Sequence, residues 1–304
     1  VKICIVGIGA VGGYFGSLLF KSGADITFVG RRESVGEVKK NGLIINDVSY
    51  SVNITSNFEE IIDSDLVLLA VKSYHLAEIA PKLAHLSPKV TTICLQNGID
   101  NDVLVKSLAP NLDVHPGLVY VSAQKIAPGN ISQSGPQKTL IFGRRDHKFD
   151  PKFVEIEKVL NQGNIDVHLS SDIQKDLWQK FIFVVSFAAV TGKFRVSIGT
   201  ALNDITMRSF YLQSLQEVIA VARAEGVNID QDIFEKSITK AESFPPETKS
   251  SFLVDLENHR QSEVDTLHHT VVSLATKHRL LVPANQTITR LTGGFSDNLF
   301  SGFG

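Results

Sequence analysis

The sequence has little cysteine and almost no net charge. Its 304 residues include two cysteines, and 30 Lys and Arg side chains nearly balance 32 Asp and Glu, for a formal net charge of −2. So few cysteines exclude a disulfide framework. Cys4 and Cys94 lie in apolar runs and are expected to be buried free thiols, as in a reducing compartment. The near-zero net charge supplies no global field that would draw the chain onto nucleic acid or an anionic membrane.

Long apolar runs and low-complexity segments are also missing. No run approaches the ~18 residues of a membrane-spanning helix, and residues 2–6 resemble a strand rather than a signal peptide. A composition of 43% hydrophobic and 20% charged residues excludes intrinsic disorder. We therefore expect a soluble, cytoplasmic protein with neither a nucleic-acid nor a membrane partner.

The first half alternates short β-branched runs with helical stretches. Runs that are nearly continuously apolar indicate parallel strands covered by helices on both faces. The predicted parallel strands are 2–6, 25–29, 66–71 and 90–95. Runs 43–45 and 49–54 predict a small hairpin. Three short strands, each broken from the next by Gly and Pro, are expected to extend the sheet in antiparallel fashion: 118–122, 130–133 and 138–142.

From about residue 171 the apolar period becomes helical. The predicted helices are 172–191, 204–225, 230–240, 249–258, 263–278 and 284–292. The Gly- and Ser-rich tail after Gly293 is expected to be loosely ordered. The length alone favours two domains. We predict an α/β chain with an N-terminal Rossmann-like, doubly wound sheet over 1–170 and an all-α domain over 171–304.

A glycine loop joins the first strand to the first helix. Gly7, Gly9 and Gly12 form a GxGxxG pattern in which Gly7 permits a tight turn, Gly9 lets the backbone approach a pyrophosphate, and Gly12 lets helix and strand pack closely. The helix N-terminus then faces the phosphates. The residues predicted to bind the dinucleotide here are Gly7, Ile8, Gly9, Ala10, Val11 and Gly12.

The end of the second predicted strand indicates which dinucleotide binds. An NAD site usually carries Asp or Glu there, whereas this chain has Gly30, Arg31 and Arg32. Guanidinium groups suit a 2′-phosphate, because Arg makes bidentate, charge-assisted hydrogen bonds to phosphate. The sequence thus favours NADP(H) over NAD(H), and a solvated loop is the alternative for the two arginines.

The chain resembles the ketopantoate reductase (2-dehydropantoate 2-reductase) family over nearly its whole length. The resemblance is carried, in order, by the glycine loop 7–16, Arg31, AlaValLysSer at 70–73, GlnAsnGly at 96–98, LeuTrpGlnLys at 177–180, SerSerPhe at 250–252, SerGluValAsp at 262–265 and ValProAlaAsn at 282–285. It implies NADPH-dependent reduction of a 2-keto acid to a 2-hydroxy acid, and a small keto acid as the partner. A homodimer is left open.

The resemblance also implies individual roles. Lys180 would be the catalytic acid, and Glu263 would orient it or bind the cofactor ribose. On the cofactor side it implies contacts from Arg31, Lys72, Asn97 and Ala123. On the substrate side it implies contacts from Asn97, Lys180, Val184, Ala188 and Ser251. From the residues alone, Lys180 on an apolar helix face would have a lowered pKa suited to an acid, with a snorkelling lysine as the alternative.

The chain departs from the family pattern at the substrate. Val184, Ala188 and Ile198 stand where the family carries asparagines, and His268-His269 replaces AsnGly. Lost hydrogen-bonding groups change substrate choice, so a more apolar analogue of ketopantoate is expected. Another hydroxy-acid or opine-type dehydrogenase and a catalytically impaired NADP-binding redox sensor stay as alternatives. The histidines between 259 and 278 lack a third ligand at sensible spacing, and we predict no metal site.

Overall fold

The computed structural model describes residues 1–291. The chain divides into two compact units, Val1–Gln174 and Lys175–Gly304. The sequence places its boundary near residue 170. The tail after Gly293, for which loose order is expected, lies outside the described residues.

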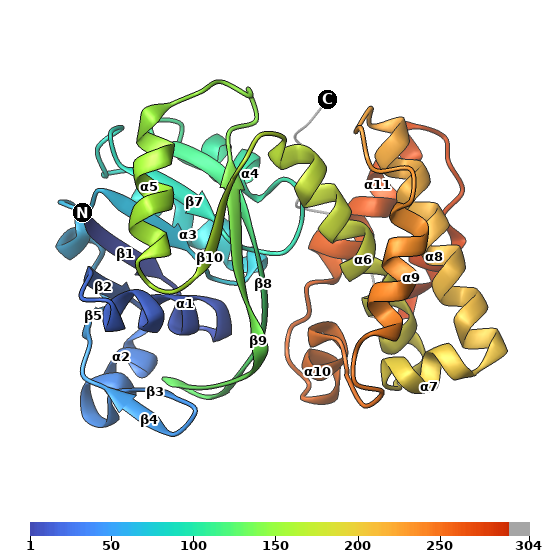
Figure 1. Cartoon of the computed structure of the whole chain (residues 1–304), viewed down its shortest axis with the longest axis horizontal. Coiled ribbons are helices and arrows are strands. Elements are labelled where there is room, and N and C mark those ends of the chain that lie inside the picture. Colours follow the sequence, from blue (N-terminus) through green and yellow to red (C-terminus); the bar gives the residue numbers. More distant parts are fainter. Residues whose placement is uncertain (292–304) are drawn as a thin grey trace. The chain divides into compact units, whose positions relative to one another are not determined.

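The centre of the first unit is a parallel sheet (Figure 1). Its strands lie in the order β7-β6-β1-β2-β5, and each neighbouring pair is parallel. The bounds are β1 (Lys2–Val6), β2 (Asp25–Val29), β5 (Asn53–Thr55), β6 (Leu66–Leu69) and β7 (Thr91–Cys94). The chain builds outward from β1 to β5 and then returns to the other side of β1, which makes the sheet doubly wound. The order reverses between β1 and β6.

Two apolar layers cover this sheet because successive side chains of each strand point to opposite faces. Ile3 and Ile5 of β1 join one core cluster, and Cys4 and Val6 join the other. The first cluster includes side chains of α1 (Ala10–Lys21), α2 (Arg32–Asn41) and α5 (Pro151–Asn161); the second includes α3 (Leu76–Leu83) and α4 (Asn101–Leu108). The Rossmann-like expectation is thereby confirmed.

Two long antiparallel strands replace the three short ones that the sequence predicts. β8 (Asp113–Ala127) starts parallel to β7 and then pairs with β9 (Asn130–Gly143) far beyond the end of β7. Residues 135–137 bulge out of the ladder, since Val121 pairs with Lys138 whereas Ser122 pairs with Ser134. Gly and Pro here mark a bulge and not a strand end.

The predicted hairpin is right in its first half only. β3 (Leu43–Ile45) pairs antiparallel with β4 (Val48–Tyr50), but β5 leaves the hairpin and joins β2 at the opposite edge of the sheet. Two further elements were not predicted from the sequence: α5, and β10 (Asp166–Ser170), which pairs with β9. Two 3-10 turns, Phe58–Ile61 and Ser73–His75, complete this unit.

The second unit is helical, as expected. Its helices are α6 (Ile173–Phe194), α7 (Ile198–Asn203), α8 (Ile205–Ala224), α9 (Ile233–Glu242), α10 (Ser251–Glu257), α11 (Thr270–Lys277) and α12 (Pro283–Leu291). α8 contacts α7, α9, α11 and α12. The short α7 was not predicted, and the predicted helix 263–278 instead contains a π-helical turn, Asp265–His269, before α11.

α6 is long and apolar enough to cross a membrane by length and composition alone. However, 72% of its most apolar window is buried inside the protein. It also carries Lys180 near its middle. Burial on this scale is the property of a core helix in a globular domain.

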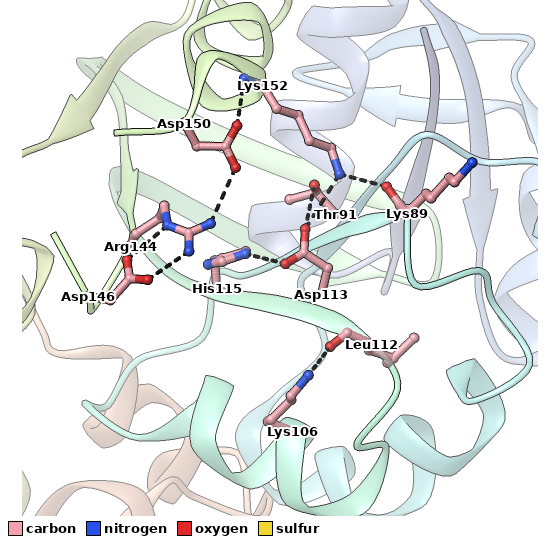
Figure 2. Close-up of polar contacts among 10 residues, drawn as sticks. All are labelled: Lys89, Thr91, Lys106, Leu112, Asp113, His115, Arg144, Asp146, Asp150 and Lys152. Atoms are coloured by element: carbon pink, nitrogen blue, oxygen red, sulfur yellow. Dashed lines mark hydrogen bonds and ion pairs between the residues drawn. The ribbon is translucent and has the colours of Figure 1, made fainter. Parts of the chain in front are cut away.

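A polar cluster around Asp113 ties the starts of β7 and β8 to α5 (Figure 2). The carboxylate of Asp113 accepts hydrogen bonds from Thr91 Oγ1 at 3.1 Å and His115 Nε2 at 2.7 Å, and Lys152 Nζ lies 3.5 Å away. Burial raises the pKa of Asp113, but the hydrogen bond and charge of His115, with Thr91 and Lys152, outweigh it and lower the pKa to about 2. This cluster lies at the amino ends of the parallel strands.

We expect Asp113→Asn to destabilise the protein by about 1–2 kcal/mol at pH 7, because it removes charge-assisted hydrogen bonds. A carboxyl group whose pKa falls on folding stabilises the fold above its unfolded pKa, near 3.8, and this contribution is lost as the pH falls through about 2. The difference between variant and parent should therefore shrink below pH 4. Urea unfolding across pH 2–7 measures it.

Asp166→Asn is the matched control. Asp166 accepts from Thr139 Oγ1 at 3.1 Å and pairs with His168 Nε2 at 3.0 Å, the same arrangement on β10, but the His and Asp side chains are 57% and 59% exposed. In the Asp113 cluster the corresponding values are 11% and 31%. Exposed pairs contribute little, so the control should change stability by less than about 0.5 kcal/mol. Equal losses in both variants would contradict the interpretation.

Candidate active site

The glycine loop follows β1 and leads into α1. Gly7 has φ +107°, and a Cβ there would lie 2.7 Å from the Val71 backbone nitrogen, so only glycine fits. The N-cap of α1 is Gly9, with no side-chain cap, no acidic residue in the first turn, and nothing within 4 Å of the position of a Cβ. A helix N-terminus with open space and no competing carboxylate suits a pyrophosphate. These residues fit a dinucleotide.

The other residues predicted in the loop contribute their backbone. Ile8 is buried, and its side chain packs against Gly30. A Cβ at position 30 would lie 2.3 Å from the Ile8 Cδ1 atom. Ala10 and Val11 begin α1 and are partly buried. The N–H groups of this first turn are therefore what the loop offers to a ligand.

Lys72 and Asn97 follow β6 and β7, at the same sheet edge as the glycine loop. Both side chains are partly buried. The neighbouring Gln96 is buried, and its Nε2 donates to the Leu69 carbonyl at 2.8 Å, which ties the end of β7 to β6 and holds Asn97 at the edge. Ligands of doubly wound sheets bind at the carboxyl edge where the strand order reverses, here between β1 and β6.

Arg31 is exposed at the end of β2 and forms the N-cap of α2. His75 lies near it, since the pKa of His75 is lowered by burial and further by the charge of Arg31. His75 is not among the residues predicted from the sequence; its place three residues after Lys72 was the available signal. Ala123 lies in the part of β8 that extends past β7 and packs against the core cluster of α1.

Lys180 is the most perturbed lysine of the second unit. It lies on α6, partly buried, and burial lowers the pKa of its ammonium to about 8. The charge of Glu263 raises this pKa, and the charge of Lys240 lowers it. Glu263 is 6% exposed, and its negative charge stabilises the ammonium form of Lys180. A lysine with a pKa near neutrality is suited to donate a proton.

A buried polar chain supports the turn that follows Glu263. Glu217 of α8 accepts from the backbone N–H groups of Ala284 at 2.8 Å and Asn285 at 3.1 Å, and from Asn285 Nδ2 at 2.9 Å. Asn285 Oδ1 in turn lies 2.9 Å from His268 Nδ1 on the π turn. Burial lowers the pKa of His268 to about 4, so the ring stays neutral at pH 7. The ValProAlaAsn motif thus forms a carboxylate-capped helix start that anchors His268.

The predicted substrate residues are spread along α6 and beyond. Val184 is partly buried one turn after Lys180, whereas Ala188 and Ile198 are each only 1% exposed and serve in packing. Ser251 is exposed at the start of α10. The adjacent Ser250 is buried, caps α10, and bonds Thr191 of α6 at 2.6 Å between hydroxyl oxygens.

In the part of the chain that the structure describes, no group of three His, Cys, Asp or Glu side chains could hold a metal ion. His269 pairs with Asp265 at 3.6 Å, and His278 with Glu225 at 2.5 Å. Cys4 and Cys94 are buried free thiols.

A doubly wound sheet with a glycine loop at its switch point, together with a lysine–glutamate pair on a helical unit, defines an oxidoreductase that uses a nicotinamide dinucleotide. Two family models agree. Residues 3–147 match the model of ketopantoate reductase PanE/ApbA, and residues 172–295 match the model of its C-terminal part. The chain belongs to the ketopantoate reductase family.

Individual relatives match over nearly their full length. An uncharacterized oxidoreductase of Bacillus subtilis, YkpB, is 27% identical over 293 residues, which are 95% of this chain and 96% of that protein. A 2-dehydropantoate 2-reductase of Pyrococcus abyssi is 27% identical over 301 residues, 97% of each chain. The solved PanE/ApbA family ketopantoate reductase of Ralstonia eutropha superposes with a TM-score of 0.87 at 26% identity and covers 96% of this chain and 97% of that one.

We expect His268→Asn to reduce the sensitivity of the protein to mild acid. A histidine whose pKa falls on folding, here from 6.5 to about 4, stabilises the fold fully above pH 6.5, and this stability is lost as the pH falls toward 4. The parent should lose about 2 kcal/mol between pH 7 and 5 from this group. Asn keeps a donor for Asn285 and does not titrate. Urea unfolding at both pH values measures the change.

His259→Asn is the control for this prediction. His259 is exposed, and its φ of +53° is one that Asn tolerates. Its substitution should leave the loss of stability between pH 7 and 5 as it is in the parent. If His268→Asn also leaves it unchanged, burial of neutral His268 is not the source of the acid sensitivity.

Proposed function

We propose that the chain catalyses NADPH-dependent reduction of a 2-keto acid to a 2-hydroxy acid, either ketopantoate to pantoate or a more apolar analogue, with Lys180 as general acid. The observation that carries the proposal is Lys180 itself, whose pKa of about 8 results from burial beside Glu263. On this proposal, residues of the first unit, predicted as 1–170, bind the cofactor. The helical unit, predicted as 171–304, carries the acid.

The residues of the first unit support NADP(H) over NAD(H). Arg31 and Arg32 are exposed at the end of β2, where an NAD site would place a carboxylate. Arg31, with His75 beside it, would bind the 2′-phosphate through charge-assisted hydrogen bonds. The first turn of α1 would hold the pyrophosphate, and Lys72, Asn97 and Ala123 would contact other parts of the cofactor, as the family resemblance implies.

The chemistry needs one hydride and one proton. Bound NADPH supplies the hydride to the keto carbon. Lys180 donates a proton from Nζ to the carbonyl oxygen as the C=O double bond becomes a C–O single bond, and neutral lysine then regains a proton from solvent. Glu263 raises the pKa of Lys180 and so keeps the ammonium protonated at neutral pH. Stabilising the developing alkoxide in this way is the main contribution of the protein.

Val184, which is apolar and partly buried one turn after Lys180, supports a less polar substrate than ketopantoate. A site that lacks hydrogen-bonding groups gains nothing from the substrate hydroxyl and must desolvate it. Ser251, at the exposed start of α10, would hold the substrate carboxylate if the family pattern applies. The two buried free thiols, Cys4 and Cys94, support a reducing, cytoplasmic location.

Lys180→Ala should lower kcat by at least about 10²-fold, since it removes the general acid, and should leave the Kd for NADPH within about twofold. In the parent, activity should fall as the pH rises through about 8, because only the ammonium can donate a proton. NADPH oxidation followed at 340 nm against a panel of 2-keto acids measures both. Lys175→Ala is the control, because Lys175 lies on the same helix and is held by Asp230 at 2.6 Å.

Turnover by Lys180→Ala equal to that of the parent would refute the role of the acid. Tight NADPH binding without turnover of any 2-keto acid by the parent would instead point to a redox sensor.

Arg31→Ala should raise KM for NADPH by about tenfold, the effect of one charged hydrogen bond at an exposed site. KM for NADH should stay the same, because NADH lacks the 2′-phosphate. Each cofactor is thus the control for the other. A parent that prefers NADH, or a variant that loses both cofactors equally, would show that the arginine does not read the 2′-phosphate.

A further inference from the structure

A largely buried ion pair lies beside the loop that follows β7, and the function proposed above does not use it. Arg145, two residues after the end of β9, donates from Nε to Asp102 Oδ2 at 2.7 Å and from Nη2 to Asp102 Oδ1 at 2.8 Å. Asp102 lies in the first turn of α4, and its side chain is 7% exposed, against 28% for Arg145. A bidentate pair of this kind fixes the orientation of both side chains.

The Arg145–Asp102 pair also holds the backbone of this loop. Nη2 of Arg145 donates a further hydrogen bond to the carbonyl oxygen of Ile99 at 2.5 Å. Ile99 is 4% exposed, so water has little access to this part of the loop, and loss of the hydrogen bond would be costly. A single guanidinium therefore connects three segments: the end of β9, the loop after β7 and the start of α4.

Asn97 lies in the same loop, two residues before Ile99. Its carbonyl oxygen accepts a hydrogen bond from Asn101 Nδ2 at 2.8 Å. Between the two held carbonyls lies Gly98, with φ +110°. Because glycine has broad conformational freedom, Gly98 does not by itself fix the direction in which the chain carries Asn97. The hydrogen bonds on either side of Gly98 fix it, and the one from Arg145 comes from a segment far away in the sequence.

The charges of the Arg145–Asp102 pair lie close to the carboxyl end of β7. Cys94 is the last residue of that strand; burial raises the pKa of its thiol, the charge of Asp102 raises it further, and the charge of Arg145 lowers it. Burial by itself would lower the pKa of Arg145, but the hydrogen bonds and charge of Asp102 outweigh this effect and raise it. The guanidinium therefore stays charged at the sheet edge where the dinucleotide is expected.

We propose that Arg145 is a positioning residue for the reaction: held by Asp102, it fixes the backbone of residues 97–99 and so keeps the side chain of Asn97 in one orientation at the sheet edge. This inference rests on the function proposed above, in which Asn97 contacts the cofactor. Hydride transfer needs a defined geometry between the nicotinamide and the keto carbon, and a misplacement of about 1 Å can cost about 10²-fold in rate. Arg145 itself touches neither reactant and acts through Asn97.

Arg144 is the matched control. It directly precedes Arg145, its side chain is 25% exposed, and it pairs with Asp146 at 2.8 Å and Asp150 at 3.3 Å (Figure 2). Asp146 lies in the turn after β9, and Asp150 is the N-cap of α5. Arg144→Met therefore removes ion pairs of an arginine that is similarly exposed, without releasing the loop that carries Asn97.

The test is a double-mutant cycle on kcat. It uses saturating NADPH and ketopantoate, or the 2-keto acid of the panel that the parent reduces fastest. Arg145→Met should lower kcat at least about tenfold in the parent. In the Asn97→Ala background the same substitution should lower kcat less than about twofold, because the group through which it acts is gone. Arg144→Met should change kcat less than about twofold in both backgrounds.

Further measurements separate positioning from a general loss of stability. Adenosine 2′,5′-bisphosphate carries the 2′-phosphate end of NADPH but no nicotinamide, so its Kd should stay within about twofold in Arg145→Met. Urea unfolding should show the same loss of stability for Arg145→Met with and without Asn97→Ala. Asp102→Asn keeps the shape of its side chain and loses the charge. It should also lower kcat, with little added effect on top of Arg145→Met, and it replaces that variant in the cycle if Arg145→Met does not fold.

The outcomes separate the two proposals. If the parent reduces 2-keto acids but Arg145→Met lowers kcat equally in both backgrounds, or not at all, the positioning role is wrong and the proposed function stands. An Asn97→Ala variant with the kcat of the parent would also overturn the positioning role. Weaker binding of adenosine 2′,5′-bisphosphate by Arg145→Met would assign the lower kcat to disruption of the whole first unit. If the parent reduces no 2-keto acid, the proposed function fails, and the role of Arg145 fails with it.

Discussion

The charge of Lys180 is the constraint on which the helical unit depends. An ammonium group on a largely buried helix loses hydration, and its pKa falls to about 8 as a result. Without a counter-charge the pKa of this group would fall further, and less of it would be protonated at neutral pH. Glu263 supplies that counter-charge from a buried position, while Lys240 opposes it. The pKa of Lys180 thus reflects the balance of one carboxylate against burial and a second cation.

A chain of buried polar side chains supports the segment that carries Glu263. Glu263 precedes a π-helical turn, a feature that often occurs at functional sites. His268 on this turn reaches Asn285, and Asn285 reaches Glu217. All three side chains are buried, and the ring of His268 stays neutral at pH 7. These hydrogen bonds hold the π-helical turn that follows Glu263 against α12 and α8.

The parallel strands of the first unit could be predicted from the sequence. Strands β1 and β2 are found at their predicted bounds, and β6 and β7 lie within theirs, because strands buried on both faces are almost continuously apolar. The β8–β9 ribbon was predicted as three short pieces, since Gly135 and Pro136 have the same composition in a bulge as in a turn. β5 was assigned to the hairpin because strand pairing across the sheet leaves no mark in local sequence. At the sheet edge, Lys72 and Asn97 were implied by the family resemblance and by their place after two predicted strands, whereas His75 was recognised only through its proximity to Arg31.

By itself, the sequence determined the class of the protein: the glycine loop before a helix, the arginines in place of an acidic residue, and the ordered motifs that end in ValProAlaAsn. These features depend on backbone conformation and on near neighbours in the chain, which local residue types control. Only the tertiary structure decided what surrounds Lys180. Glu263 and Lys240 lie far from it in sequence, and their opposing effects on its pKa come from a proximity that helix packing creates. The same packing sets Lys240 over Phe183 and buries His268 against Asn285, because burial and charge act through space and not along the chain.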